Sequence, residues 1–214
     1  MLQRLVNAIQ RFGRKRRLRL SRKEKRIIEE AKRSFDRTEP LKYLAPDRNL
    51  SDVNYHHQKD FAKIIIELSG RFPGETIRVL NEGTGQSTFK RDLERELKGK
   101  VKMQIVTTDI QRAQNPDVVT VPEELVKTFG RNSFHLVEST FGGVYHTRLF
   151  PPKKAISNVI EILKPGGIAS VIIIMDHKIE SDLGKFLSRY KNIEWQIGGL
   201  MSFRTLTIRK KWIK

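Results

Sequence analysis

The sequence lacks cysteine entirely. Without a thiol the chain can form no disulfide bond, no thiolate metal site and no covalent intermediate on a cysteine nucleophile. It also lacks a long apolar run: the longest, Ile168 to Met175, falls well short of the roughly 20 residues that span a bilayer. At 214 residues we therefore expect one domain, or one domain with an extension, and we read the apolar run as a buried strand.

Acidic residues are scarce, with 24 Asp and Glu against 42 Lys and Arg, and the net charge is +18. The excess is concentrated at the two ends. Residues 1–37 carry a net charge of +10 and residues 203–214 one of +5, whereas residues 38–202 are close to neutral. An almost neutral domain with basic ends favours a polyanion partner, which we predict to be RNA or a ribonucleoprotein bound through residues 1–37 and 203–214. A solubilising surface is the alternative.

The first residues predict a basic helical extension. Residues 2–12 place apolar side chains at helical spacing, and no acid precedes Glu24. Ser21 and Glu24 have the spacing of a capping box, which predicts a helix to about Phe35. We expect an extension over residues 1–40 and a folded domain over residues 41–214. The expected location is cytoplasmic, or mitochondrial if residues 1–20 are a transit peptide, since an Arg-rich amphipathic start fits that too.

A strand, a glycine turn and a helix are predicted near residue 80. The apolar run from Ile77 to Leu80 is followed by Asn81 and Glu82, then by Gly83-Thr84-Gly85 and a helical pattern. This order opens a doubly wound α/β sheet. Glycine accepts a positive φ and lets a backbone amide approach a ligand closely, so the turn is a candidate cofactor cradle. Ordinary strand-to-helix packing is the alternative.

An acid follows the second predicted strand, Val101 to Thr107. Asp109 comes 24 residues after Gly85. Nucleotide-binding sheets place an acid that bonds a ribose hydroxyl about 20 residues past the glycine turn. Asp109 is therefore a candidate ribose ligand, with a turn or helix-cap aspartate as the alternative.

The rest of the chain continues the alternation of strands and helices. A helix is predicted from Tyr55 to Ser69, and its adjacent His56 and His57 are interpreted as surface or capping residues because neighbours on a helix point apart. Further strands are predicted at residues 118–121, 133–139 and 168–175, with a terminal hairpin of residues 193–197 and 203–208. The side chains that would lie at the carboxyl edge of this sheet are Glu138, Ser139, Thr140, Tyr145, His146, Asp176 and His177.

Three stretches together carry a resemblance: VLNEGTGQS, then TTDI, then SFHLVESTFGGVYHT with ILKPGGIASVIII behind it. Over roughly residues 55–208 the chain resembles the class I S-adenosylmethionine-dependent methyltransferase family. The resemblance implies a Rossmann-like, doubly wound, mostly parallel sheet with an antiparallel terminal strand. It implies S-adenosyl-L-methionine as cofactor, with the methionine end at Glu82, Gly83, Thr84 and Gly85, the ribose at Asp109, and the sulfonium side at Glu138, Ser139 and Thr140. It assigns no catalytic residue and no metal.

Three positions depart from the family pattern. Asn81 stands where the family usually has an acid, Ser87 replaces the third glycine, and His135 replaces an aspartate. The expected function is a methyltransferase acting on RNA or a ribonucleoprotein. The alternatives are a methyltransferase of a small molecule or protein, and a non-catalytic RNA-binding or assembly protein on a degenerate methyltransferase fold. A P-loop lacks its lysine here, and a dinucleotide fingerprint would need glycine at Thr88.

Overall fold

The computed structural model describes residues 21–23, 25, 26, 29, 48–142, 144, 152–174, 177–199 and 203–212. Most of the predicted basic extension lies outside these residues. Tyr145, His146 and Asp176 also lie outside them, as does the side chain of His177. The division at residue 40 stays a prediction.

The described residues form one seven-stranded sheet in the order β3-β2-β1-β4-β5-β7-β6. Its parallel part comprises β1 (Ile77–Glu82), β2 (Met103–Asp109), β3 (Val118–Val119), β4 (Phe134–Ser139) and β5 (Leu163–Ile174). The chain runs outward from β1 to β3 and then returns to place β4 on the other side of β1. The carboxyl ends of β1 and β4 therefore flank the switch point where such sheets bind ligands.

The far end of the sheet is an antiparallel hairpin, as predicted. It consists of β6 (Ile193–Gly198) and β7 (Phe203–Lys210), and β7 lies between β6 and β5, antiparallel to both. The fold is therefore Rossmann-like, with a mostly parallel sheet and an antiparallel strand near its end. The third strand is shorter than predicted, because only Val118 and Val119 pair with β2.

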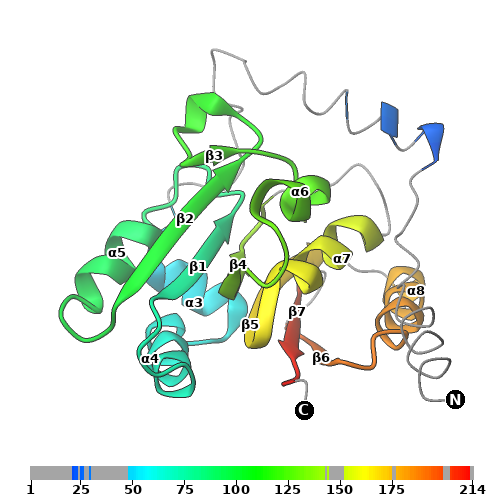
Figure 1. Cartoon of the computed structure of the whole chain (residues 1–214). Helices are drawn as coiled ribbons and strands as arrows, with labels where there is room; N and C mark the ends of the chain where they lie inside the picture. The colour runs from blue at the N-terminus through cyan, green and yellow to red at the C-terminus, as the bar shows by residue number, and fades with distance from the viewer. Residues whose placement is uncertain are drawn as a thin grey trace, which may run out of the picture.

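Helices cover both faces of the sheet (Figure 1). On one face lie α3 (Leu50–His57), α4 (Phe61–Arg71) and α5 (Phe89–Glu96); on the other lie α6 (Leu125–Phe129), α7 (Lys153–Ile162) and α8 (His177–Leu187). Short 3-10 turns occupy Arg112–Gln114 and Pro122–Glu124. The two faces have separate apolar clusters. Leu136 belongs to the first and Val137 to the second, as the two-residue period of a strand requires.

The predicted continuous helix from Tyr55 to Ser69 is wrong, because two helices meet there at an angle. Gln58 ends α3 in the left-handed region at φ 52°, and Asp60 caps α4 by accepting the Lys63 amide at 2.9 Å. The Asn54 side chain also accepts the Phe61 amide at 3.1 Å. Such local side-chain acceptors compete with helix continuation. Because of this break, α3 is a separate helix, and its last residue, His57, contacts Ser170 on β5.

Within the described part of the chain, no helix is both long enough and apolar enough to cross a membrane.

Candidate functional site

Polar side chains are buried together at the carboxyl ends of β1, β2 and β4. Asn81 on β1 pairs with Glu138 on β4, and Glu82 pairs with Thr108 on β2. All four side chains are buried, as are Asp109, Ser139 and Thr140. Buried polar groups are costly unless they are hydrogen-bonded, so this edge is organised by its hydrogen bonds.

The glycine turn and Asp109, which the sequence predicted to be neighbours, are in contact. Gly83 and Gly85 have φ values of 67° and 51°, a backbone region that favours glycine. The Thr84 amide donates to the Thr108 carbonyl at 2.8 Å, and the Gly85 amide donates to Asp109 Oδ2 at 3.0 Å. The turn is thereby held against the tip of β2.

Asp109 keeps capacity for a further donor. Burial raises the pKa of its carboxyl group, while the amides of Gln111, Gly85 and Ile110 lower it by smaller amounts. A carboxylate has about four acceptor positions, so these donors do not saturate it. Among the described residues, Thr108 Oγ1 and Asn81 Oδ1 are buried without any hydrogen-bond partner. Unsatisfied buried atoms cost about 1–3 kcal/mol each. Their presence at the switch point is consistent with a site that a ligand completes.

Glu82 is wholly buried, and burial raises the pKa of its carboxyl group to about 7. Ser139 Oγ donates to Glu82 Oε2 at 2.6 Å and the Val144 amide donates to the same oxygen at 3.3 Å, which limits the rise. Gly142 lies directly over this carboxyl group. A Cβ at residue 142 would lie 2.8 Å from Glu82 Oε2 and would also meet the Glu82 main-chain oxygen. Gly142 is therefore needed for close approach.

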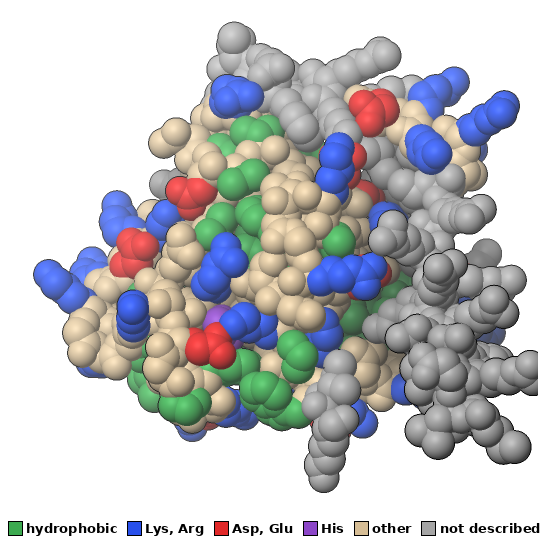
Figure 2. Space-filling view, in the orientation of Figure 1, with side chains coloured by type: hydrophobic (Ala, Val, Ile, Leu, Met, Phe, Trp, Pro, Cys, Tyr) green, Lys and Arg blue, Asp and Glu red, His purple; other side chains and the backbone are tan. Residues whose placement is uncertain are grey.

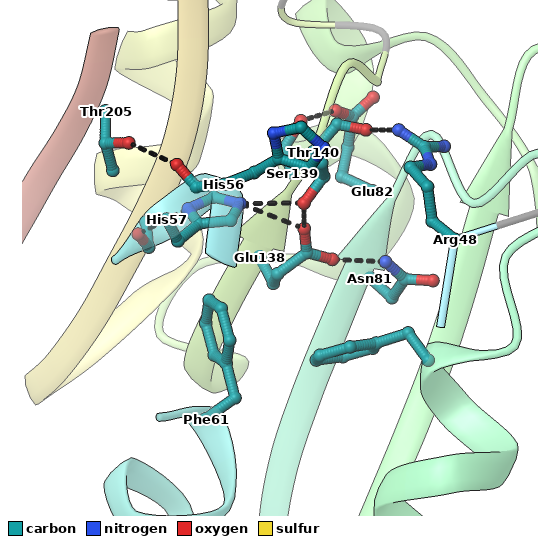
Figure 3. A network of polar contacts seen from close by, with 12 residues as sticks. Arg48, His56, His57, Phe61, Asn81, Glu82, Glu138, Ser139, Thr140 and Thr205 are labelled. Carbon is teal, nitrogen blue, oxygen red and sulfur yellow. Dashed lines mark hydrogen bonds and ion pairs between the residues drawn. The ribbon is translucent and has the colours of Figure 1, made fainter. Parts of the chain in front are cut away.

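Glu138 is the centre of a buried network that joins four segments (Figure 3). Asn81 Nδ2 donates to Glu138 Oε2, and Thr140 Oγ1 donates to Glu138 Oε1. His57 Nε2 lies 3.3 Å from Glu138 Oε1 and 2.7 Å from Thr140 Oγ1. The other ring nitrogen, Nδ1, lies 2.8 Å from Ser170 Oγ on β5.

His57 corrects the sequence analysis, since its predicted surface or capping role is wrong. Its side chain is buried, together with Leu50 and Val53 of the same helix. Spacings of three and four residues from these apolar positions already placed His57 on the inward face. The outward interpretation holds only for His56, which is exposed. Burial, followed by the neighbouring His57, lowers the pKa of His56.

The Asn81 departure is explained by its partner. An amide at this position donates to Glu138, whereas an acid would place a second carboxyl group against a buried one. Like charges at that separation cannot both ionise cheaply. The asparagine is thus a physical match for the glutamate beside it.

Arg48 ties the segment before α3 to the site, and nothing in the sequence pattern had singled it out. Its guanidinium donates to the Thr140 carbonyl (Figure 3). It also donates to the Gly83 carbonyl at 3.4 Å. Its own carbonyl accepts Ser87 Oγ at 2.7 Å and the Thr88 amide at 2.9 Å. Ser87, the second departure, therefore replaces a glycine with a side chain that anchors Arg48.

His135, the third departure, lies away from the site, toward the amino end of β4. Its Nδ1 accepts the Arg78 amide at 2.9 Å, and its Nε2 lies 3.2 Å from Glu75 Oε2. Phe72 packs edge-on against the ring at 4.5 Å. Burial, followed by Lys164, lowers the pKa of His135, which favours a neutral ring that accepts a backbone bond. The histidine is a structural element of the sheet.

The tail is only partly available to a partner. Lys210 is buried, and its ammonium donates to Asn132 Oδ1 at 2.8 Å and to the carbonyls of Ile160 and Leu163 at 3.1 and 2.5 Å. Lys211 is exposed and lies 3.5 Å from Glu194. Within the described ranges, no group of three or more His, Asp or Glu side chains is placed to hold a metal ion.

Comparison with known proteins gives likenesses in structure alone. No family model matches the chain, and no curated protein matches its sequence. A Methanococcus maripaludis protein classed as an S-adenosyl-L-methionine-dependent methyltransferase is 12% identical, with 81% of this chain and 99% of that chain covered and a TM-score of 0.49. The CurJ carbon methyltransferase is 12% identical over 75% of this chain and 57% of that chain, with a TM-score of 0.47. An rRNA methylase from Streptococcus thermophilus is 12% identical over 70% and 95%, with a TM-score of 0.46.

At these identities and scores the likenesses carry no inference about activity, which is left to the site itself. The chain's own features are its sheet order, the antiparallel β7 and the contact between Gly85 and Asp109 at the switch point. In its fold, the chain resembles the class I S-adenosylmethionine-dependent methyltransferases.

Proposed function

We propose that this protein is an S-adenosylmethionine-dependent methyltransferase that acts on RNA or a ribonucleoprotein. The proposal depends above all on one contact, the 3.0 Å hydrogen bond from the Gly85 amide to Asp109 Oδ2. It joins a side-chain-free turn and a carboxylate at the switch point of a doubly wound sheet. That combination suits a ligand with a ribose at one end and a small charged group at the other.

The residues present fit such a cofactor. Thr108 Oγ1 and Asn81 Oδ1 are buried and lack partners among the described residues, and Asp109 retains acceptor capacity. Glu82, Gly83, Thr84 and Gly85 would hold the methionine end, Asp109 the ribose, and Glu138 and Ser139 the sulfonium side. The cofactor would supply a methyl group on a positive sulfur, an inherently good leaving centre. The protein then has mainly to align the methyl donor with the acceptor, which rigidly held side chains around the cofactor can do.

The network around Glu138 supports that alignment. His57, Thr140 and Asn81 fix both carboxylate oxygens from three directions, and Arg48 holds the Thr140 carbonyl. Side chains locked by such second contacts lose little freedom when a substrate arrives. No group here is assigned as a general base, because methyl transfer from a sulfonium needs positioning more than proton transfer.

An RNA acceptor is favoured by charge. The chain carries +18 overall, and the excess is concentrated at its ends. On the face drawn in Figure 2, Lys and Arg side chains are spread over the described surface, with Asp and Glu side chains between them. Because the Lys210 ammonium is bound to main-chain carbonyl groups, the basic arm at residues 1–37 is the main proposed anchor for RNA.

One observation favours the non-catalytic alternative. Two acids of the site already accept hydrogen bonds from neighbouring residues. Glu82 accepts from Ser139 and Val144, and Glu138 accepts from Asn81 and Thr140. A degenerate fold could keep such a network for stability alone. The following experiment separates the two functions.

Titration calorimetry of the whole chain with S-adenosylhomocysteine tests the proposal. We expect binding, and a loss of about 10- to 100-fold in Asp109→Ala, the range for removing hydrogen bonds to a charged acceptor. Asp117→Asn is the matched control, because Asp117 is an exposed carboxylate close to Asp109 that accepts from Thr107 and Lys90. If the folded wild-type chain shows no binding, the enzymatic proposal is wrong. Methyl transfer from labelled cofactor to RNA or to protein then identifies the acceptor class.

A further inference from the structure

The outer side of α3 carries exposed aromatic side chains that the core does not use. Leu50, Val53 and His57 face inward and are buried. Tyr55, between them in sequence, is 74% exposed, the largest value among the exposed large hydrophobic side chains of the described residues. A single exposed ring contributes little to folding and is common on protein surfaces, so the rings that Tyr55 contacts decide whether it has a role.

This exposed ring is connected to the site through two others. The rings of Tyr55 and His56 meet edge to face with centroids 5.6 Å apart, and those of His56 and Phe141 meet in the same way at 5.0 Å. Phe141 directly follows Thr140, whose hydroxyl binds Glu138. The three rings, which we call the aromatic strip, thus run from solvent to the loop that leaves the tip of β4.

The backbone at the inner end of the strip is held in an uncommon conformation. Phe141 has a φ of 50°, in the left-handed region that non-glycine residues rarely adopt. It stands between Thr140, whose carbonyl accepts from Arg48, and Gly142, which lies over Glu82. Such conformations persist where surrounding contacts enforce them, commonly at ligand sites.

Positive charge flanks the strip at both ends of α3. Arg48, before the helix, is close enough to lower the pKa values of both His56 and Asp109. Lys59, after the helix, is half-buried, and the nearby Arg209 adds to burial in lowering its pKa. Asp52 is the acid on α3 that acts on His56, and its carboxylate caps the helix at Asn49. Aromatic faces between cations are the combination by which proteins hold unpaired nucleotides.

We propose that the aromatic strip of Tyr55, His56 and Phe141 is a stacking subsite for an unpaired nucleobase of the RNA acceptor. The inference depends on the proposed function, because it names the nucleotide that the methyl-transfer site would receive. Tyr55 supplies the open face, His56 supports it from the edge, and Phe141 borders the reaction site. The flanking cations would contact the phosphates on either side of the base.

The test compares single-stranded RNA with an abasic strand of the same length, measured by fluorescence anisotropy with the full chain. Tyr55→Ala should weaken binding of the base-bearing strand by about 10- to 100-fold, the effect of losing one stacked base. It should leave the abasic strand within about twofold, and leave the slope of log affinity against log salt unchanged, since stacking releases no counterion. Tyr55→Phe keeps the ring and should bind as wild type does.

Ile66→Ala is the matched control. Ile66 is a 48% exposed apolar side chain on α4, so its removal trims outer surface without touching the strip. The proposal is overturned if Tyr55→Ala binds the base-bearing strand as tightly as wild type, or if both strands weaken equally. Binding of S-adenosylhomocysteine, measured on the same variants, distinguishes the two proposals. If the wild-type chain binds S-adenosylhomocysteine but its RNA affinity does not depend on Tyr55, only the stacking subsite is refuted. If the wild-type chain does not bind S-adenosylhomocysteine, the methyltransferase proposal is refuted, whatever the effect of Tyr55→Ala.

Discussion

His135 and Glu138 lie three residues apart on β4, and each belongs to a histidine–glutamate pair in a different environment. His57 lies 3.3 Å from Glu138 near the carboxyl end of β4, and both side chains are fully buried. His135, near the amino end, lies 3.2 Å from Glu75, whose side chain is 46% exposed and also contacts Lys164. The distances are alike, but both side chains of the first pair are enclosed by protein, whereas Glu75 of the second pair is open to solvent.

The difference shows that contact geometry alone does not rank these interactions. A buried carboxylate depends on each of its donors, because losing one partner leaves the others desolvated. An exposed one exchanges its partners for water at small cost. The carboxyl edge is therefore where substitutions should be felt, and the amino edge supplies matched controls.

The largest expected effect is that of Glu138→Ala. Removing this carboxylate leaves donors of Asn81 and Thr140 unpaired beside His57, so the free energy of unfolding should fall by about 3–5 kcal/mol. Glu75→Ala should change it by no more than about 0.5 kcal/mol. Urea unfolding of both variants measures the contrast. Equal losses from the two would mean that burial does not separate the pairs.

The second effect is a pH dependence that comes from Glu82. Its pKa is raised by burial from 4.5 to about 7 in the folded chain, so it holds a proton there that the unfolded chain releases. Stability should therefore fall as pH rises from about 4.5 to 7 and stay reduced above, by up to about 3 kcal/mol. Glu82→Gln should remove this fall in a series of thermal midpoints.

Glu75 supplies the opposite sign for the same series. The Lys164 contact lowers its pKa, so its contribution is present above the ordinary glutamate range and lost as pH falls below it. Its exposure keeps that contribution small.

If the stability of Glu82→Gln falls as steeply between pH 4.5 and 7 as that of wild type, another group carries the pH dependence.

The smallest contrast concerns two glycines. Ala at Gly142 would place its Cβ against the main chain of Glu82 and 2.9 Å from Ser139 Oγ, and buried backbone cannot give way. We expect a loss of about 2–3 kcal/mol. Ala at Gly166 would meet the Trp212 ring at 2.5 Å, but that ring is exposed and can swing aside. There the positive φ of 84° should cost about 1–2 kcal/mol. Unfolding in denaturant decides, and a larger loss at Gly166 would contradict the ranking.

Local patterns in the sequence predicted much of this fold. Apolar strands, the glycine turn and the position of Asp109 follow from short-range periodicity, and the terminal hairpin follows from two alternating segments around glycine. What was missed depends on contacts between distant residues. His57 contacts Thr140, 83 positions later in the sequence, and Ser170, 113 positions later. The Arg48 side chain contacts Thr140, 92 positions later. No local window contains both partners.

Two errors have local causes that a closer reading could detect. The helix break at Gln58 could be predicted from Asn54 and Asp60, because their side chains accept hydrogen bonds from backbone amides of the next helix. Lys210 was counted among the cations for RNA, yet it alternates with exposed Arg209 and exposed Lys211, so it points inward. Charge counting along the chain treats all three alike, whereas the pleat of β7 does not.

The short helix α3 sets a limit on how the chain can be divided. Arg48 at its start clasps the turn after β1 and the loop after β4, and His57 at its end reaches β5. A protein trimmed of residues 1–37 would keep Arg48 and His57, and with them these contacts. One trimmed ten or so residues further would lose the clasp as well, so a fall in RNA binding there would report on a damaged site as much as on a missing anchor.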